Sequence, residues 1–285
     1  MNTIAERLQA HQDGLTRSER QLSDIILQNY PASGLGTITS LAQAASVSTP
    51  TVARLVQKLG FPGFPDFQRG LRAELNEKIS NPLAKRERWV DDAPEEHLLN
   101  KFTRAVIENI DQSMARLDPE AFEQACTLLS DPKRQVFVVG GRITRTLADY
   151  IFLHLQMIRE NVVQVASNSN AWPHYMLDLE PGDVLVVFDV RRYENSTLKL
   201  AEIANERGAE IILFTDQWVS PIKKHAGIYF ASQIAAPSAW DSNIALMLMS
   251  ELIIAEVQER NWGDTRSRIE ELEEMFDRTR FFRKF

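Results

Sequence analysis

The second half of the chain carries five short runs of apolar, largely β-branched residues, separated by stretches with helical periodicity. The runs lie at residues 136–139, 162–165, 183–188, 210–214 and 228–230. A run that is apolar almost throughout, rather than at every second position, is typical of a strand buried on both faces. Helices are expected between the runs, at about 144–159 and 196–207. This alternation predicts a five-stranded parallel sheet covered by helices.

The ligands of such a sheet bind at the carboxyl ends of its strands, where the connecting loops form a crevice. In this chain those loops begin at Gly140, Asp189, Thr215 and Ala235. They are therefore the first place to look for a binding site.

The first quarter of the chain contains a helix whose start and end can be read directly from residues 48–64, STPTVARLVQKLGFPGF. Ser48 suits an N-cap, Pro50 is tolerated in a first turn, and Gly60 suits the end of a helix. One face is apolar at helical spacing and is expected to be buried: Val52, Leu55, Val56 and Leu59. The opposite face is small, polar or cationic and fits the major groove of DNA: Pro50, Ala53, Arg54, Gln57 and Lys58.

The residues before this helix complete a helix-turn-helix pattern. Residues 39–45 supply a first helix with the small Ala42 at the crossing point, and Ser46 and Val47 make the turn. Ser46 stands where glycine is usual in such turns. Thr16 and Glu19 have the spacing of a capping box for an earlier helix through Leu27. A plain pair of antiparallel helices is the alternative interpretation.

Composition and charge fit two domains of different kinds. A chain of 285 residues has room for about two domains, and its net charge of −7 is unusual for a nucleic-acid binder. Residues 1–77, however, hold seven basic and seven acidic groups, so the whole deficit lies in the remainder. We expect a helical head at 1–80, a charged linker at 81–97 and a sheet domain with a C-terminal helix at 98–285.

Other features exclude several kinds of site. The single cysteine, Cys126, rules out an intrachain disulfide and lies in a helical pattern, where a buried thiol is expected. The five histidines have no ligand-like spacing, so no metal or cofactor is expected. No apolar run is long enough to cross a membrane and the N-terminus lacks a signal core, so a cytoplasmic protein is expected.

The chain resembles the RpiR family of transcriptional regulators, which join a helix-turn-helix head to a sugar-isomerase (SIS) domain. The resemblance is most specific in the head, at Leu15-Thr-x-x-Glu19-Arg20, Val47-Ser48-x-x-Thr51-Val52-x-Arg54 and Lys58-Leu59-Gly60-Phe61-x-Gly63-Phe64. It implies a bacterial regulator that dimerises and senses a small metabolite, commonly a phosphorylated sugar.

The sheet domain departs from the pattern of that family in two places. SIS domains carry Gly-x-Gly-x-Ser after the first strand, where this chain has Gly140, Gly141, Arg142, Ile143 and Thr144. After the third strand the family has Ser-x-Ser-Gly-x-Thr, which holds a phosphate. Here the aligned residues include Asp189, Arg191, Arg192 and Glu194.

Arginines could replace the missing hydroxyls. Arg142, Arg191 and Arg192 offer planar forks that suit a carboxylate as well as a phosphate. This favours an effector that bears a carboxylate or is zwitterionic, with Asp189 and Glu194 either bracing the arginines or binding a polar ligand group. The alternative is that these charges pair with one another and leave a degenerate site. The candidate effector-binding residues are Gly140, Gly141, Arg142, Thr144, Asp189, Arg191, Arg192, Thr215 and Ser238. Ser238 and Ser242 could contact the ligand, but N-capping of the helix that follows by Asp241 or Ser242 is at least as well supported.

The expected function is that of a DNA-binding regulator that responds to a small molecule, rather than an enzyme. The candidate DNA-binding residues are Ser48, Thr49, Thr51, Arg54 and Lys58, with Arg54 the expected base reader. One such helix reads only one half-site, so a homodimer or homotetramer on double-stranded DNA is expected. The alternative is a sugar-phosphate isomerase, for which Glu194 is the obvious acid in the third loop.

Overall fold

The computed structural model describes residues 3–28, 30–79, 82–83, 85 and 97–282. The chain divides into two compact units, Met1–Ala84 and Lys85–Phe285. Most of the expected linker at 81–97 lies outside the described residues. Lys85 is described and is buried rather than solvated.

The first unit is all-helical, as expected. Its helices are α1 (Ile4–Ala10), α2 (Arg17–Gln28), α3 (Ile38–Ala44), α4 (Thr49–Lys58) and α5 (Phe64–Ile79), with short 3-10 turns at Gln12–Gly14 and Ala32–Gly34. Helix α1 was not predicted from the sequence. Apolar side chains from all five helices form one buried cluster, including Leu8, Leu22, Leu41, Leu55 and Phe67.

The ends of these helices follow from local sequence. The capping box of α2 is confirmed, since Glu19 Oε2 accepts from Thr16 N at 2.9 Å and Thr16 Oγ1 accepts from Glu19 N at 3.4 Å. After α3, Ser46 adopts a φ of 51° and Val47 N donates to the carbonyl of Ala42 at 2.9 Å. This is the left-handed cap of a Schellman motif. Gly60 ends α4 in the same way, with a φ of 84°.

The second unit contains the predicted five-stranded sheet, with every strand parallel to its neighbours. The strands are β1 (Val136–Gly140), β2 (Val162–Gln164), β3 (Val184–Phe188), β4 (Glu210–Asp216) and β5 (Ile228–Ser232), in the order β2-β1-β3-β4-β5. The order reverses between β1 and β3, so the loops after these two strands diverge at the carboxyl edge of the sheet. That edge is where the expected effector residues lie.

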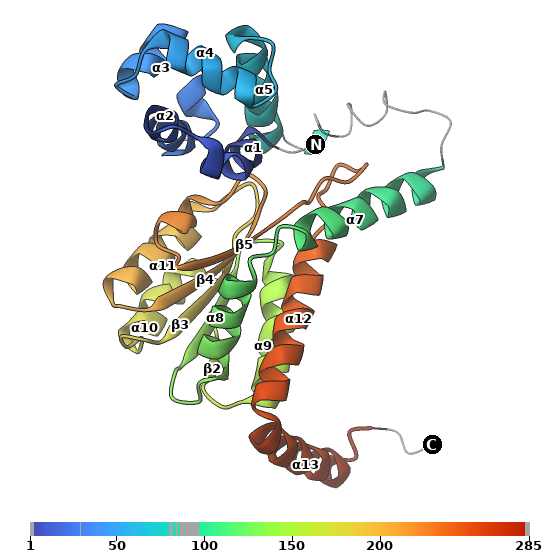
Figure 1. Ribbon diagram of the computed structural model, residues 1–285. Helices are drawn as coiled ribbons and strands as arrows, with labels where there is room; N and C mark the ends of the chain where they lie inside the picture. Colours follow the sequence, from blue (N-terminus) through green and yellow to red (C-terminus); the bar gives the residue numbers. More distant parts are fainter. Residues whose placement is uncertain (1–2, 29, 80–81, 84, 86–96, 283–285) are drawn as a thin grey trace. The chain divides into compact units, whose positions relative to one another are not determined.

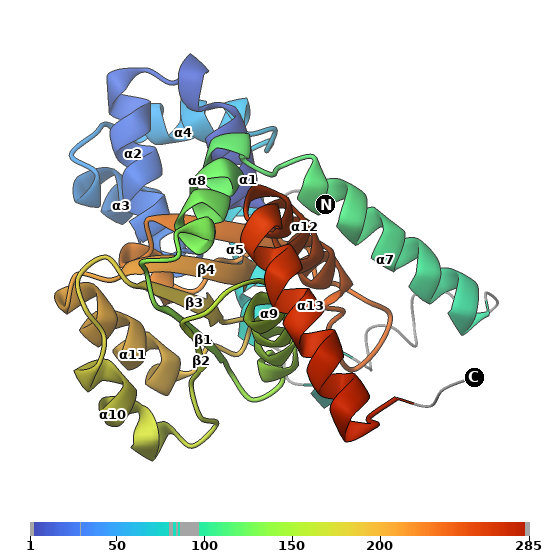
Figure 2. The ribbon, with the colours of Figure 1, turned by 90° about the horizontal axis from the view of Figure 1, so that it is seen from below.

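Helices cover both faces of the sheet (Figures 1 and 2). One face is packed by α8 (Pro119–Ser130), α9 (Arg145–Ile158) and α12 (Ile244–Arg260), and the other by α10 (Trp172–Leu177) and α11 (Asn195–Glu206). Side chains alternate between the two cores, since Val136 and Val138 face the first cluster while Phe137 and Val139 face the second. The run at residues 136–139 is apolar throughout because both faces of the sheet are buried at this strand.

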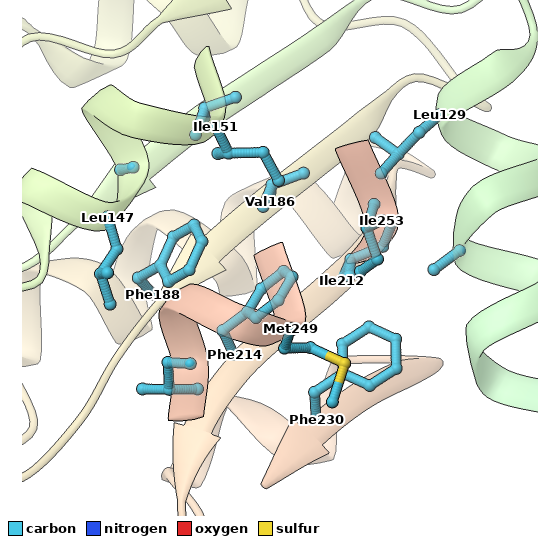
Figure 3. Close-up of a cluster of buried hydrophobic side chains, with 14 of the residues drawn as sticks. Leu129, Leu147, Ile151, Val186, Phe188, Ile212, Phe214, Phe230, Met249 and Ile253 are labelled. Atoms are coloured by element: carbon cyan, nitrogen blue, oxygen red, sulfur yellow. The ribbon is translucent and has the colours of Figure 1, made fainter. Parts of the chain in front are cut away.

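The larger core is organised around aromatic rings from neighbouring strands (Figure 3). Phe188 of β3 stacks on Phe214 of β4 with 4.4 Å between ring centroids, and Phe214 is 5.2 Å from Phe230 of β5. Met249 and Ile253 of α12 close this cluster. Cys126 of α8 is fully buried as expected, and burial raises the pKa of its thiol to about 12.

Two further helices complete the second unit, α7 (Leu98–Met114) and α13 (Trp262–Thr279). Both carry exposed apolar side chains, including Leu98, Leu99, Ile107, Trp262 and Met275. Within the described ranges, no helix is long and apolar enough to cross a membrane.

Candidate functional site

The two faces of α4 are those that the sequence predicts. Val52 and Leu55 are fully buried, and Val56 and Leu59 nearly so. Pro50, Arg54, Gln57 and Lys58 are exposed. Within the helical unit, the cationic face of α4 is therefore exposed and available to a partner molecule.

Hydrogen bonds at the start of α4 orient Arg54. Ser48 occupies the N-cap position with extended backbone, but its hydroxyl lies 2.9 Å from Thr51 Oγ1 instead of capping an amide of the helix. Thr51 is buried, and its hydroxyl accepts from Arg54 Nη2 at 3.1 Å. Thr51, expected as a DNA contact, thus lies beneath Arg54 and holds its guanidinium.

Lys58 is held in a similar way at the other end of α4. Its Nζ lies 2.7 Å from Glu19 Oε2 and 3.3 Å from the carbonyl of Gly14. Burial raises the pKa of Glu19, but hydrogen bonds from Lys58 and Thr16 outweigh it and hold the pKa below its ordinary value. The charge of Lys58 is therefore offset by a buried carboxylate.

At the carboxyl edge of the sheet, the turn after β1 is closed by Thr144. Its hydroxyl donates to the carbonyl of Phe188 at 2.8 Å and accepts from Gly141 N at 2.9 Å. A Cβ on Gly140 would lie 2.7 Å from backbone atoms of Thr144 and Arg145. Thr144 and Gly140 therefore shape the turn, and Thr144 is buried.

The arginines of this edge differ in their surroundings. Arg142 and Arg192 are exposed, and the backbone amide of Arg142 donates to Glu194 Oε1 at 2.7 Å. Arg191 is buried, with only 3% of its side chain exposed. Its guanidinium forms a two-pronged contact with Asp241, at 2.9 Å from Nε to Oδ2 and 2.6 Å from Nη2 to Oδ1. Arg191 thus pairs with Asp241, an acid outside the set of charges that the sequence placed at this edge.

Asp189 does not brace an arginine in the way the sequence suggested. It is buried and accepts hydrogen bonds from the hydroxyls of Ser220 and Thr197. Burial raises its pKa to about 6. Thr215 is also fully buried, where it donates to the carbonyl of Asp189 at 2.8 Å and accepts from Ser220 N at 3.0 Å. Asp189 and Thr215 thus join the loops after β3 and β4.

A second buried carboxylate, Asp216, supports the same loop. It accepts from Arg191 N at 2.7 Å, from the hydroxyl of Tyr193 at 2.7 Å and from Trp218 N at 3.0 Å. Burial raises the pKa of Asp216, while these hydrogen bonds oppose that rise. The Arg191 guanidinium lies 4.4 Å from the Trp218 ring centroid, a cation–π contact.

Asp241 has a different role from the one expected. The N-cap of α12 is Asn243, so the prediction of Asp241 or Ser242 as the cap is wrong. Asp241 instead lies between Arg191 and Lys85, whose Nζ is 2.5 Å from Oδ1. Ser238 is half-buried and its hydroxyl accepts from Trp240 N at 3.1 Å. Lys85, Tyr193 and Trp218 were not predicted as site residues, because nothing in the sequence pattern connects their side chains to Arg191.

No three His, Cys, Asp or Glu side chains within the described ranges gather in a way that could hold a metal ion. The carboxyl edge of the sheet carries two exposed guanidiniums and one buried ion pair. Its hydroxyl groups are already hydrogen-bonded to backbone carbonyls and carboxylates. Such a surface can bind an anion.

Comparison with known proteins decides the family. The helix-turn-helix domain of the rpiR family matches residues 2–78, and the SIS domain matches residues 128–255. The chain belongs to the RpiR family of transcriptional regulators. The HexR regulator of Pseudomonas aeruginosa is 27% identical over 219 residues, covering 75% of this chain and 74% of that protein. The HexR regulator of Escherichia coli K12 is 26% identical over 253 residues, covering 88% and 83%.

Solved structures share the fold. The sugar isomerase domain of an RpiR transcription factor from Sphaerobacter thermophilus has a TM-score of 0.58 at 23% identity, over 62% of this chain and 97% of that one. The Vibrio vulnificus NanR protein, complexed with ManNAc-6P, has a TM-score of 0.56 at 15% identity, over 97% and 99%. With relatives named as regulators and a helix-turn-helix head, this RpiR-family chain is a transcriptional regulator and not an isomerase.

Proposed function

We propose that this regulator reads operator DNA with α4 and responds to a small anionic metabolite bound at the carboxyl edge of its sheet. The observation that carries the DNA-binding half is the exposed Arg54, whose guanidinium is held by the buried Thr51 at 3.1 Å. An arginine oriented in this way reads guanine in the major groove through two parallel hydrogen bonds.

The other residues of the helix position it on the phosphates. Ser48 and Thr49 lie at its N-terminus, where hydroxyls and the positive end of the helix dipole favour a phosphate. Lys58 can contact a DNA phosphate only when its ion pair with Glu19 is broken. The role of Thr51 in this proposal is to position Arg54.

The DNA-binding half is tested by replacing Arg54 with alanine. The operator is first selected from random duplex DNA with the wild-type protein, and affinity is then measured by gel shift. Losing a base-reading arginine should weaken operator binding by about 1–3 kcal/mol and relax sequence preference at one position. Arg72→Ala is the matched control, because it removes a guanidinium that is also exposed, from α5. Equal operator affinity in Arg54→Ala and wild type would refute the assignment.

The effector half rests on the exposed Arg142 and Arg192 beside the turn at Gly140 and Gly141. The NanR structure is a complex with ManNAc-6P. In this chain Asp189, Arg191, Arg192 and Glu194 stand where the family has its phosphate-binding hydroxyls, so we propose a carboxylate-bearing or zwitterionic effector instead. Gly140, Gly141, Thr144, Asp189 and Thr215 frame that site, and Ser238 borders it.

A thermal-shift panel tests the effector class. Carboxylates and amino acids should raise the melting temperature of the full chain in a concentration-dependent way, and Arg192→Ala should abolish the shift. Stabilisation by aldose and ketose phosphates, with none by carboxylates, would overturn this half of the proposal.

We further propose that the regulator works as a homodimer or homotetramer in the cytoplasm, where its DNA is. One helix-turn-helix covers one half-site, so two copies are needed for a palindromic or repeated operator. The exposed apolar side chains on α7 and α13 suit contact with a second copy. Sedimentation of the full chain, with an operator carrying one or two half-sites, tests this point.

A further inference from the structure

The carboxylate of Asp241 is shared by two cations that come from distant parts of the second unit. Arg191 follows β3 and grips both oxygens of the carboxylate, while Lys85 Nζ lies 2.5 Å from Oδ1. Lys85 Nζ also donates to the carbonyl of Trp240 at 3.0 Å. One carboxylate therefore holds both the effector edge of the sheet and the residue that directly follows the DNA-binding unit, Met1–Ala84.

The contact to Arg191 has the geometry with which a guanidinium binds a carboxylate ligand. Two parallel N–H···O bonds form, and the ring of Trp218 covers the guanidinium at 4.4 Å. Arg191 is also fixed through its backbone, since its amide donates to the buried Asp216 at 2.7 Å. Arg191 is thus a rigid anion receptor whose present occupant is a side chain of the protein itself.

The carboxylate of Asp241 can be replaced on Arg191 by a carboxylate that arrives from solvent. The side chain of Asp241 is 19% exposed, while that of Arg191 is 3% exposed. An arriving carboxylate would replace one carboxylate by another on the same guanidinium, so the buried charge of Arg191 keeps a carboxylate partner. A neutral ligand would take the carboxylate of Asp241 away from the buried guanidinium without supplying another negative charge. The ion pair therefore selects for anions.

We propose that Asp241 is an internal competitor for the effector's carboxylate at Arg191, and that its displacement also breaks the ion pair with Lys85. The inference rests on the proposed effector site. In this proposal Arg191 binds the effector's carboxylate, Asp241 is the group displaced, and Lys85 loses its ion pair as a result. Breaking this ion pair removes one of the contacts that hold Lys85, the residue that directly follows the DNA-binding unit, and in this way connects effector binding to operator binding.

The test uses Asp241→Asn in the full-length protein, with malonate as the carboxylate probe. Removing the competitor should lower the dissociation constant for malonate by about tenfold or more, a difference of about 1.4 kcal/mol or more. Hydrogen–deuterium exchange at the amide of Lys85 should rise in Asp241→Asn without malonate, and in wild type only with malonate. Asp149→Asn is the matched control, because it removes a carboxylate from another arginine, Arg145, on the same unit. It should change neither quantity.

A second variant keeps the test valid if Asp241→Asn folds poorly. Lys85→Met leaves the contact between Arg191 and Asp241 in place but removes the ion pair that displacement of Asp241 would break, so it should raise exchange at the amide of residue 85 and also tighten malonate binding. If wild type and Asp241→Asn bind malonate equally, and Arg192→Ala does not bind it, Asp241 is not a competitor. The proposed effector site would remain valid in that case. Malonate binding to neither protein would overturn both the competitor and a carboxylate site at this edge.

Discussion

Lys58, in the last turn of α4, forms an ion pair with Glu19, in the first turn of α2, with 2.7 Å between Nζ and Oε2. The carboxylate is 3% exposed and the lysine side chain 40%. Glu19 therefore serves two purposes, since it caps α2 through Thr16 and it offsets a cation on the face of α4 that is proposed to meet DNA. The recognition helix thus has less effective positive charge than its sequence suggests.

Replacing Glu19 with glutamine should strengthen DNA binding. Glutamine preserves the capping box but removes the negative charge, so Lys58 becomes available to a phosphate. The slope of log affinity against log salt should steepen by about one per half-site, which fluorescence anisotropy between about 50 and about 200 mM salt can measure. The double variant Glu19→Gln/Lys58→Ala should restore the wild-type slope. A slope unchanged by Glu19→Gln would show that Lys58 does not reach the backbone.

The stability of the helical unit should fall as pH rises, through Glu74. Burial raises the pKa of this carboxyl group to about 7. One oxygen accepts from Ile4 N at 2.9 Å, and the other accepts from the hydroxyl of Tyr30. Because the folded pKa lies above the ordinary 4.5, the contribution of Glu74 is complete below pH 4.5 and is lost as the pH rises through about 7.

Thermal melts of the full chain between about pH 5 and about pH 8 measure this effect. Glu74→Gln can accept from Ile4 N through its oxygen and donate to the hydroxyl of Tyr30 through its amide nitrogen, and it does not titrate. The melting temperature of the helical unit should therefore depend less on pH in the variant. Identical pH dependence in the two proteins would show that another group controls it.

Much of the fold could be predicted from sequence because the signals are local. The buried face of α4 follows from the spacing of Val52, Leu55, Val56 and Leu59, and the strands follow from short apolar runs. The candidate site was harder, because its contacts join residues far apart in the chain. Arg191 and Asp241 are separated by 50 residues, and Lys85 and Asp241 by 156.

Asp189 illustrates the same limit from the other side. Its position after β3 made it a candidate for an exposed site residue. The hydroxyl of Ser220, which occupies one of its oxygens, comes from the loop after β4. No pattern within either segment indicates that Asp189 and Ser220 are in contact, so the burial of Asp189 was not predictable from sequence.

A methyl group at Gly140 should destabilise the sheet domain. The Cβ of Gly140→Ala would lie 2.7 Å from the amide nitrogen of Arg145 and from the carbonyl carbon and oxygen of Thr144. These are backbone atoms at the start of α9, so they cannot rotate away. We expect a loss of about 2 kcal/mol or more, measured by urea unfolding. Gly227→Ala is the control, since its Cβ would have no described atom within 4 Å. A Gly140→Ala protein as stable as Gly227→Ala would contradict the close approach.

The turn of the helix-turn-helix should respond to substitution at Ser46 according to backbone strain. Ser46 has a φ of 51° and is exposed, so its side chain contributes little packing. A left-handed conformation costs a residue with a Cβ about 1–2 kcal/mol, and glycine avoids that cost while losing about 0.5–1 kcal/mol in conformational entropy. Ser46→Gly should therefore be neutral or more stable by up to about 1 kcal/mol.

Ser46→Val should go the other way, because a β-branched residue is a genuine outlier at positive φ. It should destabilise the helical unit by more than about 1 kcal/mol, and operator affinity should fall only in proportion to the fraction unfolded. Chemical denaturation of both variants, followed by gel shift under folding conditions, separates the two effects. If the valine variant is as stable as the glycine variant, the left-handed turn between α3 and α4 is not the conformation that the protein adopts.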